Sequence, residues 1–285
     1  MTPVQQRFIN WILEREKARE AKILGEPYTG DPIIEKFRFC NVNREHDNVT
    51  EWIAQNVRPA LAKKPLAEVI YQLYICRVFN EPECLEDIVP LVTHKTALNR
   101  LQHRRKAGLK LLRGAYLVVP HGQSVDVEVY YMNLAAKVRK LEYGKPTTLK
   151  EVADVMLKLD GLGEFMVNQV CTDLRYQPGH DTWADWKTFV LAGPGTRRGL
   201  ARYLTPPGAT TPRNPKGRIS QRKGPCESVL IEIRADLVGR LPDRIAHHLQ
   251  DINNLSNCFC EFDKYERARD GEASLRRYQN GNHQS

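Results

Sequence analysis

The stretch "LDGLGEFMVNQV" (residues 159–170) places two glycines, Gly161 and Gly163, between two apolar patterns of helical spacing. Glycine permits a tight turn, and the helix expected from about residue 163 adds its N-terminal N–H donors to the outward-facing amides of that turn. The stretch therefore predicts a hairpin between two helices that can hold a DNA phosphate. Contacts of this kind position DNA without reading its sequence. We assign Gly161 and Gly163 to DNA binding.

Helical patterns extend outward from this hairpin over most of the chain. Apolar residues recur at helical spacing in many segments, which are 2–20, 47–57, 66–80, 84–92, 94–113, 124–142, 148–158, 163–175, 182–191 and, as two helices, 228–255. The pattern at 148–158 opens with a capping box, in which Thr148 is followed by Glu151. Strand-like alternation is brief. The sequence predicts an all-α fold.

Length and composition indicate a globular protein. The 285 residues are 41% hydrophobic, which is enough for a substantial core. No apolar run approaches the roughly 20 residues that a membrane span requires, and the charged N-terminal sequence is unlike a secretory signal. We therefore expect no membrane association and a cytosolic or nuclear location.

The cysteines and histidines do not indicate a metal site. The seven cysteines are scattered without a CxxC pair, which favours reduced thiols over a disulfide framework or a zinc ribbon. Four histidines stand at spacings that suggest no ligand set, and we interpret them as structural: His46, His94, His247 and His248. No metal ligand is predicted.

Charge is unevenly distributed. The formal net charge is +9. Residues 186–226 hold nine Lys or Arg and no carboxylate, and a second run at 100–113 adds six basic residues without an acidic one. Such patches neutralise phosphates and release counterions, which favours a polyanionic partner; a solvated basic face is the alternative that charge alone leaves open.

The segment 205–225, "TPPGATTPRNPKGRISQRKGP", is rich in turn-forming residues and predicts an exposed basic loop that is ordered by nucleic acid. We assign its basic residues to DNA binding: Arg213, Lys216, Arg218, Arg222 and Lys223.

Six ordered motifs between residues 37 and 278 carry a resemblance to a known family. The motifs are "FRFCNVNREHDNVTEWI" (37–53), "YICRVFNEPECLEDI" (74–88), "LRGAYLV" (112–118), "LGEFMVNQVCTDLRY" (162–176), "DWKTFVLAGPGTRRGL" (185–200) and "NCFCEFDKYERARDGEASLRRY" (257–278). Together with the spacing from the hairpin to Asp185, they resemble the helix-hairpin-helix DNA glycosylase superfamily. Within it, the chain is most similar to a divergent branch, the alpha-glutamyl/putrescinyl thymine pyrophosphorylase family, which includes amino acid:DNA transferases of bacteriophage thymine hypermodification.

The resemblance implies a two-lobed helical fold with a DNA-binding cleft between the lobes. The expected division has an N-terminal helical extension (1–36) before a glycosylase-like catalytic domain (37–278). In that domain, lobe one spans about 37–110 plus 226–278, and lobe two spans about 111–204 with the hairpin at 159–167. The basic loop (205–225) and a disordered tail (279–285) complete the division.

The resemblance also implies a substrate and a reaction. The substrate is double-stranded DNA with a 5-hydroxymethyluracil base that a separate kinase has phosphorylated, as a mono- or diphosphate. The reaction replaces the phosphate with an amine from a free amino acid or a polyamine, in the cytoplasm of the host cell. Lyase-type glycosylases of the superfamily keep a catalytic lysine where this chain has Phe165. The nucleophile would here arrive as a second substrate.

Such chemistry requires phosphate-binding groups and a general base. In "GPGTRRG", Gly193 and Gly195 are expected to allow close backbone approach to the phosphate. Arg197 and Arg198 are expected to contact the phosphate oxygens. An incoming ammonium must lose a proton, so a carboxylate with a raised pKa is needed. Asp185 is the expected base.

Glu261 is the alternative base, and Lys264 is grouped with it among the catalytic residues. Both share with Tyr265 a charged helical string, "CEFDKYER", which is expected to flank the cleft, with Tyr265 contacting substrate. The alternative interpretation is an ordinary solvated helix.

Two further pairs of polar residues are expected to bind substrate. Arg44 and Asp47 lie one helical turn apart and can pair with each other, with a surface ion pair as the alternative role. Arg77 and Asn80, at the end of a strongly apolar helix, are expected to bind the amino acid's carboxylate or to cap the helix.

Several familiar motifs are absent from the 285 residues. There is no GxxxxGK[ST], so we expect that this chain is not itself the kinase that phosphorylates the base. A zinc deaminase signature and the four-cysteine spacing for an iron–sulfur cluster are also absent, and the only cofactor considered is a monovalent cation at the hairpin. Three hypotheses remain: an amine-transferring enzyme, a glycosylase that excises a modified base with Asp185, and a non-catalytic DNA-binding module.

Overall fold

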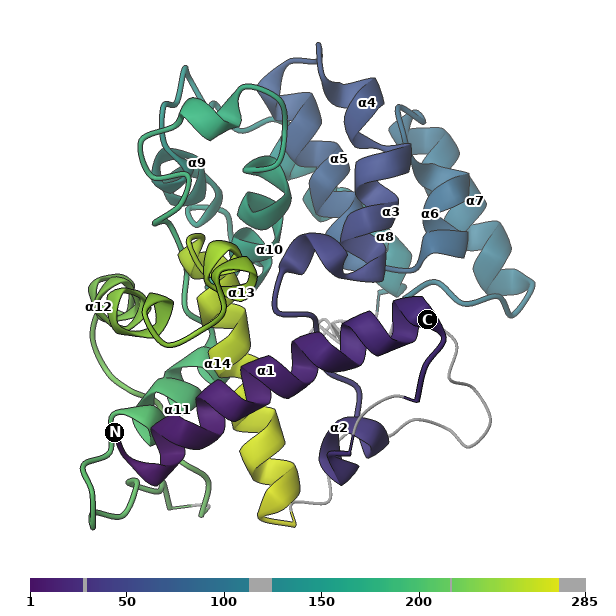
Figure 1. Cartoon of the computed structure of the whole chain (residues 1–285). Helices are drawn as coiled ribbons and strands as arrows, with labels where there is room; N and C mark the ends of the chain where they lie inside the picture. Colours follow the sequence, from purple (N-terminus) through teal and green to yellow (C-terminus); the bar gives the residue numbers. More distant parts are fainter. Residues whose placement is uncertain (28–29, 113–124, 216, 272–285) are drawn as a thin grey trace. The chain divides into compact units, whose positions relative to one another are not determined.

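The expected all-α fold is confirmed by the computed structural model, which describes residues 1–27, 30–112, 125–215 and 217–271 (Figure 1). No strand is assigned within these ranges, although Arg213 and Ile219 form an isolated antiparallel bridge. The chain divides into two compact units. Unit 1 comprises Met1–Asp47 and Lys187–Ser285, and unit 2 comprises Asn48–Trp186.

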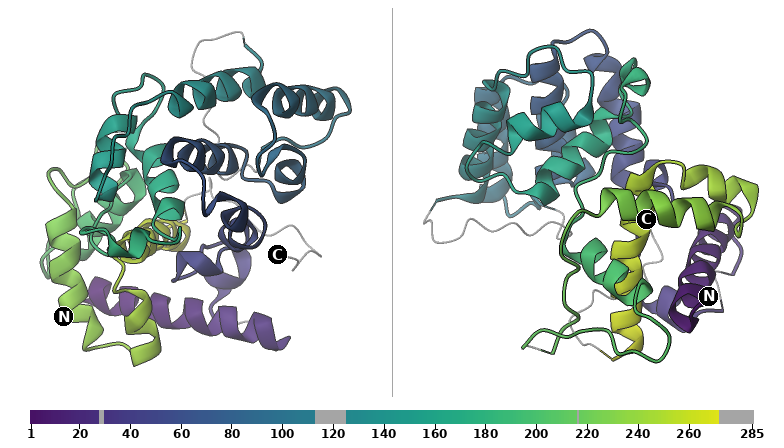
Figure 2. Two further views of the ribbon diagram at one scale, coloured as in Figure 1. Left: turned by 90° about the horizontal axis from the view of Figure 1, so that it is seen from above. Right: turned by 90° about the vertical axis from the view of Figure 1, so that its left-hand side faces the viewer.

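Unit 1 is built around two helices that pack closely along each other, α11 and α14 (Figure 2). Its elements are α1 (Pro3–Leu24), α2 (Pro32–Lys36), the 3-10 turn η1 (Arg44–His46), α11 (Pro194–Tyr203), α12 (Glu227–Val238), α13 (Asp243–His248) and α14 (Ile252–Arg269). Aromatic rings fill the core between α1, α11 and α14. Phe8 stacks on Phe259 with ring centroids 4.2 Å apart, and Tyr203 and Phe262 pack edge-on against Phe8.

Helix α1 is part of this core, not the separate extension that we expected for residues 1–36. It opens with a capping box at Thr2 and a proline at its first turn. Phe8 and Ile12, one turn apart, are fully buried. The expected domain boundary at residue 36 is wrong because the apolar face of α1 packs in the same core as α11 and α14.

Unit 2 surrounds one buried helix. Its elements are α3 (Asn48–Asn56), α4 (Arg58–Leu61), α5 (Leu66–Phe79), α6 (Pro82–Ile88), α7 (His94–Lys106), α8 (Val127–Arg139), α9 (Leu149–Met156), α10 (Glu164–Leu174) and the 3-10 turn η2 (His180–Thr182). Every residue of α5 from 69 to 79 is buried, and α5 packs against α8 and α10. A helix that is buried on nearly all sides lies in a core, and α5, which is apolar apart from Gln72 and Arg77 in its buried stretch, forms the centre of the core of unit 2.

The division of the catalytic domain also differs from the expected lobes. Residues 48–110 were expected in lobe one, but they belong to the same unit as α8, α9 and α10 because α5 packs on α8 and α10. The tail 279–285 lies outside the described residues. A cleft between two lobes stays a prediction.

The helix expected at 182–191 is wrong. Only the short turn η2 and further turns form there. The indole of Trp186 donates to the carbonyl of Arg175 at 2.7 Å, and the Arg175 guanidinium returns a bond to the Trp186 carbonyl at 3.0 Å. These two hydrogen bonds join Trp186 to Arg175, which lies outside the segment, and they form in place of the helical hydrogen bonds that were expected.

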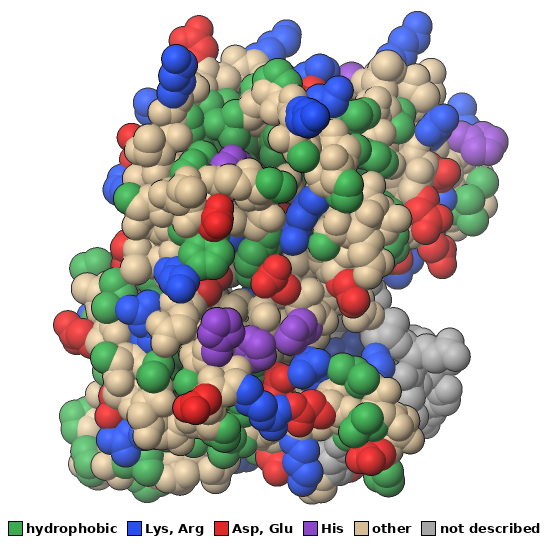
Figure 3. Space-filling view, turned by 45° about the horizontal axis from the view of Figure 1, so that its top comes forward, with side chains coloured by type: hydrophobic (Ala, Val, Ile, Leu, Met, Phe, Trp, Pro, Cys, Tyr) green, Lys and Arg blue, Asp and Glu red, His purple; other side chains and the backbone are tan. Residues whose placement is uncertain are grey.

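The surface mixes both signs of charge. On the displayed face, Lys and Arg side chains are spread among Asp and Glu, and a group of histidines gathers at one place (Figure 3). Within the described residues, no helix is long and apolar enough to cross a membrane.

Candidate functional site

The segment 38–44 runs antiparallel to α14 and is held there by side-chain contacts. The pairs, in order along the two stretches, are Arg38 with Lys264, Cys40 with Glu261, Val42 with Cys258 and Arg44 with Asn254. In each pair, a backbone N–H or C=O group of the segment bonds to a side chain of α14. Because an irregular segment has no ladder of its own, these bonds satisfy backbone groups that would otherwise be buried and unpaired.

Further side chains extend this arrangement into a polar network. Arg15 of α1 donates to the carbonyls of Phe39 and Cys40 at 3.3 and 3.0 Å, and to the Asn41 side chain at 2.6 Å. We define the polar network as Arg15, Cys40, Asn41, Arg44, Asp47, Asn254, Asn257, Glu261 and Lys264. It joins two of the sequence motifs, 37–53 and 257–278.

Arg44 and Asp47 form the predicted pair inside this network. The Nε of Arg44 lies 2.9 Å from Asp47 Oδ2, and the Asn41 amide donates to Asp47 Oδ1 at 2.8 Å. Arg44 is buried, so the alternative of a surface ion pair is excluded. Burial raises the pKa of the Asp47 carboxyl from its ordinary value of 3.8, against the opposing effect of Arg44.

Glu261 and Lys264 are engaged in the same network. They lie 3.3 Å apart, and the ammonium of Lys264 also sits 4.7 Å from the centre of the Phe39 ring. Glu261 is 8% exposed, which contradicts an ordinary solvated helix at this position. Both side chains hold the segment 38–40 in place, and a catalytic role for them stays a prediction.

Tyr265 contacts a helix cap. Its hydroxyl donates to Asp31 Oδ2 at 2.8 Å, while Asp31 Oδ1 accepts the Ile33 amide at 2.8 Å and caps α2. Burial, reinforced by the Asp31 carboxylate, raises the pKa of Tyr265. The residue therefore fixes α2 to α14, and substrate contact stays a prediction.

The thiols near the network are not nucleophiles at neutral pH. Burial raises the pKa of Cys40 well above its ordinary value and that of Cys260 to about 12. A cysteine reacts as the thiolate, so both protonated thiols are inert near pH 7.

The glycines of "GPGTRRG" serve helix packing. Gly193 is the N-cap of α11. A Cβ on Gly195 would lie 2.4 Å from the sulfur of Cys260, and one on Gly199 would lie 2.2 Å from the carbonyl oxygen of Phe259. The expected backbone approach of Gly195 to a phosphate is corrected, because α14 occupies the space that its missing side chain leaves.

The two arginines of this motif are engaged within unit 1. Arg197 donates from Nε to the Ala192 carbonyl at 3.0 Å and from Nη1 to the Gly224 carbonyl at 2.9 Å. Arg198 donates to Asp263 Oδ2 at 2.7 Å. Both guanidinium groups already have acceptors, so phosphate binding by them stays a prediction that requires exchange of these partners.

In unit 2, Asp185 caps a helix. Its Oδ1 accepts the Leu149 amide at 2.7 Å and its Oδ2 accepts the Lys150 amide at 2.9 Å, at the N-terminus of α9. Two backbone donors thus occupy both oxygens, an arrangement that stabilises the helix end. The geometry gives Asp185 a structural role, and its role as a base stays a prediction.

Arg77 binds a carboxylate, but an internal one. Its Nε and Nη2 contact the two oxygens of Asp173 at 2.5 and 2.6 Å, and Nη2 also donates to Thr50 at 2.8 Å. Both charged side chains are buried. The expected pairing with a free amino acid is corrected, because Asp173 takes that position. Asn80 adopts the left-handed conformation as the C-cap of α5, which confirms the capping interpretation.

The hairpin forms as predicted between α9 and α10. Gly161 has φ of +94°, and Gly163 is the N-cap of α10. A Cβ on Gly161 would also lie 3.1 Å from the Tyr130 hydroxyl, so glycine is needed for both conformation and packing. Gly161, Gly163 and Phe165 are exposed, and contact with DNA or a monovalent cation stays a prediction.

The loop 205–225 is irregular and largely exposed, as expected. Arg213, Arg218 and Lys223 are exposed, and Arg222 is half-buried. Among the described residues, none of these four forms an ion pair. Arg213 and Arg222 donate to backbone carbonyls within the loop. Lys216 lies outside the described residues.

Sequence reasoning missed much of the polar network. Arg15 and Asn254 lie outside the six quoted motifs, and Asn257, which opens the motif 257–278, was assigned no role. The available signal was the amide-rich start of α14, "INNLSN", in which buried Asn254 and half-buried Asn257 lie one turn apart on a helix otherwise packed into the core. Polar side chains on a buried helical face require partners, and segment 38–44 provides them.

Comparison with known proteins identifies the class. Residues 2–274 match the family model described as "5-hmdU DNA kinase, helical domain", and the chain therefore belongs to this family. The match places it in thymine hypermodification of DNA, as the resemblance implied, but it is to the kinase family of that pathway and not to the transferase family.

A curated relative is a 5-hmdU DNA kinase of Bacillus phage SP10. It is 21% identical over 226 residues, which cover 68% of this chain and 35% of the relative. The chain thus spans about a third of the length of that relative. No solved structure matches significantly.

Proposed function

We propose that this chain binds DNA carrying bases derived from 5-hydroxymethyluracil and takes part in their hypermodification. The observation that carries this proposal is the family match over residues 2–274. The exposed basic residues of the loop 205–225 support a polyanionic partner, since among the described residues they form no ion pair.

The finer form of the proposal is amine transfer to a phosphorylated base. A pathway kinase would first phosphorylate the 5-hydroxymethyl group. The nitrogen of an amino acid or polyamine then bonds to the 5-methylene carbon, the carbon–oxygen bond to the phosphate breaks, and the phosphate leaves with the electron pair. The ammonium proton must pass to a base before attack.

Asp47 is the carboxylate that we propose as this base. Its pKa is raised by burial, which is the property that the chemistry requires. Its side chain is 17% exposed, and its Oδ2 is buried against Arg44 at 2.9 Å. Proton transfer to Asp47 therefore requires this pair to open, which would also release Arg44 toward an anionic group. Asp185 is less suited to this role because it caps the N-terminus of α9 by accepting the backbone amides of Leu149 and Lys150.

A second candidate is the presentation of 5-hydroxymethyluracil for phosphorylation. The description of the matching family favours it. The 285 residues contain no GxxxxGK[ST], so residues outside them would supply the phosphate-binding loop for ATP. Asp47 would then accept the proton of the 5-hydroxymethyl group.

One experiment separates these functions. The chain is incubated with DNA containing thymine, 5-hydroxymethyluracil or its phosphate ester, each with and without ATP and a mixture of amines, and the digested nucleosides are weighed by mass spectrometry. An amine adduct formed only from the phosphate ester supports transfer. A phosphorylated nucleoside formed only with ATP supports the kinase step.

Release of free base with abasic sites contradicts both candidates and indicates a glycosylase. Unchanged nucleosides together with a gel shift contradict amine transfer. They indicate a binding module, and they agree with a chain that only presents the base to a phosphate-binding domain outside the 285 residues.

The role of Asp47 has its own test. Asp47→Asn should reduce turnover at least a hundredfold while DNA binding persists, and it should remove the acid limb of the pH–rate profile. In the parent protein that limb lies above the ordinary Asp pKa of 3.8, since burial raises the pKa of Asp47 and activity is lost as pH falls through it. Glu45→Gln, which changes an exposed carboxylate two residues away, is the matched control. An unchanged acid limb in Asp47→Asn would assign the base elsewhere.

A further inference from the structure

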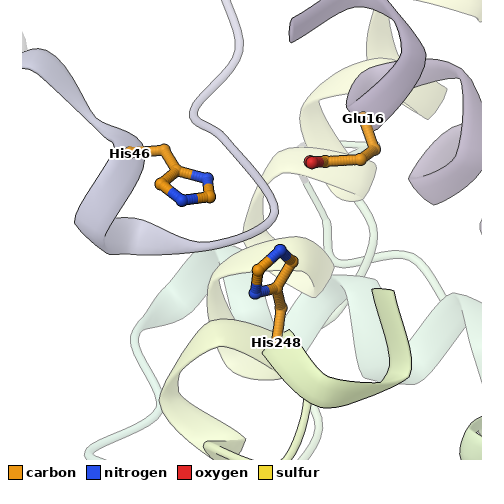
Figure 4. Close-up of side chains that lie close together, drawn as sticks. All are labelled: Glu16, His46 and His248. Carbon is orange, nitrogen blue, oxygen red and sulfur yellow. The ribbon is translucent and has the colours of Figure 1, made fainter. Parts of the chain in front are cut away.

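Three side chains from distant parts of unit 1 converge at one point. Glu16 lies in α1, His46 in η1 and His248 at the end of α13. Each offers a ligand atom, and these atoms lie within 4.8 Å of one another. Figure 4 shows the three side chains pointing toward one another from three separate ribbons.

Two side-chain atoms of these residues that can ligate a metal are buried without a hydrogen-bond partner. They are Oε2 of Glu16 and Nδ1 of His46. The Glu16 side chain is only 2% exposed, and its other oxygen is engaged by Arg19 at 2.6 Å. A buried polar atom without a hydrogen-bond partner reduces the stability of the fold by about 1–3 kcal/mol. Two such atoms in one cluster therefore indicate a bound ion or molecule that satisfies them.

The imidazoles are in the form that binds metal ions. Burial is the main cause that lowers the pKa of His46 and of His248 below 6.5, so both rings are neutral near pH 7 and present a lone pair. Asn43 lies 3.3 Å from His248 Nδ1, which leaves Nε2 as the ring nitrogen that is open to an ion. The two rings lie edge to face with centroids 5.3 Å apart.

Two imidazoles and one carboxylate suit a first-row divalent ion such as Zn²⁺. Ligands that bind zinc tetrahedrally at about 2.0–2.1 Å lie about 3.4 Å apart. The ligand atoms of Glu16, His46 and His248 lie within 4.8 Å of one another. Side-chain rotations that move these atoms by about an ångström would bring them to the spacing of zinc ligands. His46 and His248 are half-buried, so a fourth ligand can enter from solvent.

We propose that Glu16, His46 and His248 form a binding site for a divalent transition-metal ion, with water as the fourth ligand. The ion ties α1, η1 and α13 together, three elements that are far apart in sequence. It lies next to the polar network, because Asn41 donates to the carbonyl of His46 at 2.5 Å and Asp47 follows His46 directly. The site does not depend on the proposed function.

The test is zinc binding by the full chain after chelator treatment. Isothermal titration with Zn²⁺ should show one ion per chain with a dissociation constant in the micromolar range or tighter, and Co²⁺ should give the visible absorption bands of tetrahedral coordination. Saturating Zn²⁺ should raise the melting temperature by about 4 °C or more, since an ion that binds only the folded chain stabilises it.

Variants assign the binding to these residues. His46→Ala, His248→Ala and the nearly isosteric Glu16→Gln should each weaken zinc affinity at least tenfold and reduce the rise in melting temperature. His247→Ala is the matched control, because His247 neighbours His248 in sequence, is exposed and lies outside the cluster. Glu16→Gln keeps the shape of the side chain, so it separates loss of a ligand from loss of folding.

Three results would overturn the proposal. They are no zinc binding by the parent chain, equal binding by the parent and all three ligand variants, and an equal loss in His247→Ala.

Discussion

Several arginines of unit 2 pair with carboxylates, whereas the described arginines of the basic loop in unit 1 do not. In unit 2, arginine side chains pair with carboxylates in several places: Arg77 with Asp173, Arg104 with Asp87, Arg105 with Asp126 and Glu128, and Arg139 with Glu68. In the loop 205–225, the described residues Arg213, Arg218, Arg222 and Lys223 form no ion pair. In the sequence, the run 100–113 of unit 2 and the loop 205–225 look alike, because each holds five or six basic residues and no acidic one.

The difference shows that a run of basic residues is not yet a basic surface. The run 100–113 lacks acidic residues of its own, but Asp87, Asp126 and Glu128 come to it from neighbouring parts of unit 2. Its positive charge is therefore largely neutralised. The loop receives no such partners among the described residues, so its charge stays available to a phosphate backbone.

The largest expected effect comes from breaking a buried pair in unit 2. Arg77→Ala leaves the Asp173 carboxylate buried and uncompensated, since Arg58 at 3.9 Å is too distant to replace both bonds. We expect a loss of about 3–5 kcal/mol in the free energy of unfolding, measured in urea. Arg240→Ala is the control, because its exposed pair with Asp236 should contribute little to the free energy of unfolding. A small effect at Arg77 would mean that its charge is not structural.

A somewhat smaller loss is expected at Arg105. Glu128 is fully buried, and its carboxylate has no hydrogen bond apart from its ion pair with Arg105 at 2.8 Å. Arg105→Ala should reduce stability by about 3 kcal/mol, at the lower end of buried pairs because Arg105 itself is half-exposed. The double variant Arg105→Ala/Glu128→Leu should recover most of it. If Glu128→Leu does not restore stability, the loss in Arg105→Ala does not come from the unpaired carboxylate of Glu128.

The third prediction concerns DNA affinity. Replacing Arg213, Arg218 and Lys223 by Ala should flatten the slope of log affinity against log salt by about 2.7, at about 0.9 per lost phosphate contact. The control carries the same charge change in unit 2, at Arg100, Lys106 and Arg139, and should leave the slope nearly unchanged. Equal slopes in the two triple variants would show that the loop 205–225 contacts DNA phosphates no more than the basic residues of unit 2 do.

The smallest effect is expected at Asp185. Asp185→Ala removes the acceptor for the amides of Leu149 and Lys150, and we expect a loss of about 1 kcal/mol in the free energy of unfolding. Asp181→Ala, at an exposed neighbour, should cost less. Loss of turnover without loss of stability would instead restore Asp185 as a catalytic residue.

Local sequence patterns predicted the helices well where the partner of each signal is close in the chain. The capping box at Thr148 and the positive φ at Gly161 depend on neighbours within a few residues, and both occur. The predicted helix at 182–191 failed because its bonding partners lie outside it, as with Trp186 and Arg175. A periodic pattern does not report such competition.

The candidate site was harder to predict. The spacing of Arg44 and Asp47 predicted their ion pair, but it did not predict that Arg44 is buried beside α14. Gly195 and Gly199 were visible as small residues one turn apart, yet their function in helix packing depends on Cys260 and Phe259. The histidines were read one at a time, and no spacing connects Glu16, His46 and His248.

The sequence by itself determined the all-α fold, the hairpin and the basic loop, because helix periodicity, caps and turns act over a few residues. Only the tertiary structure decided which charges are engaged. Arg77 meets Asp173 across 96 residues and Cys40 meets Glu261 across 221. Whether a guanidinium or carboxylate stays free for a ligand depends on partners that packing brings to it, and these partners have no fixed spacing in the chain.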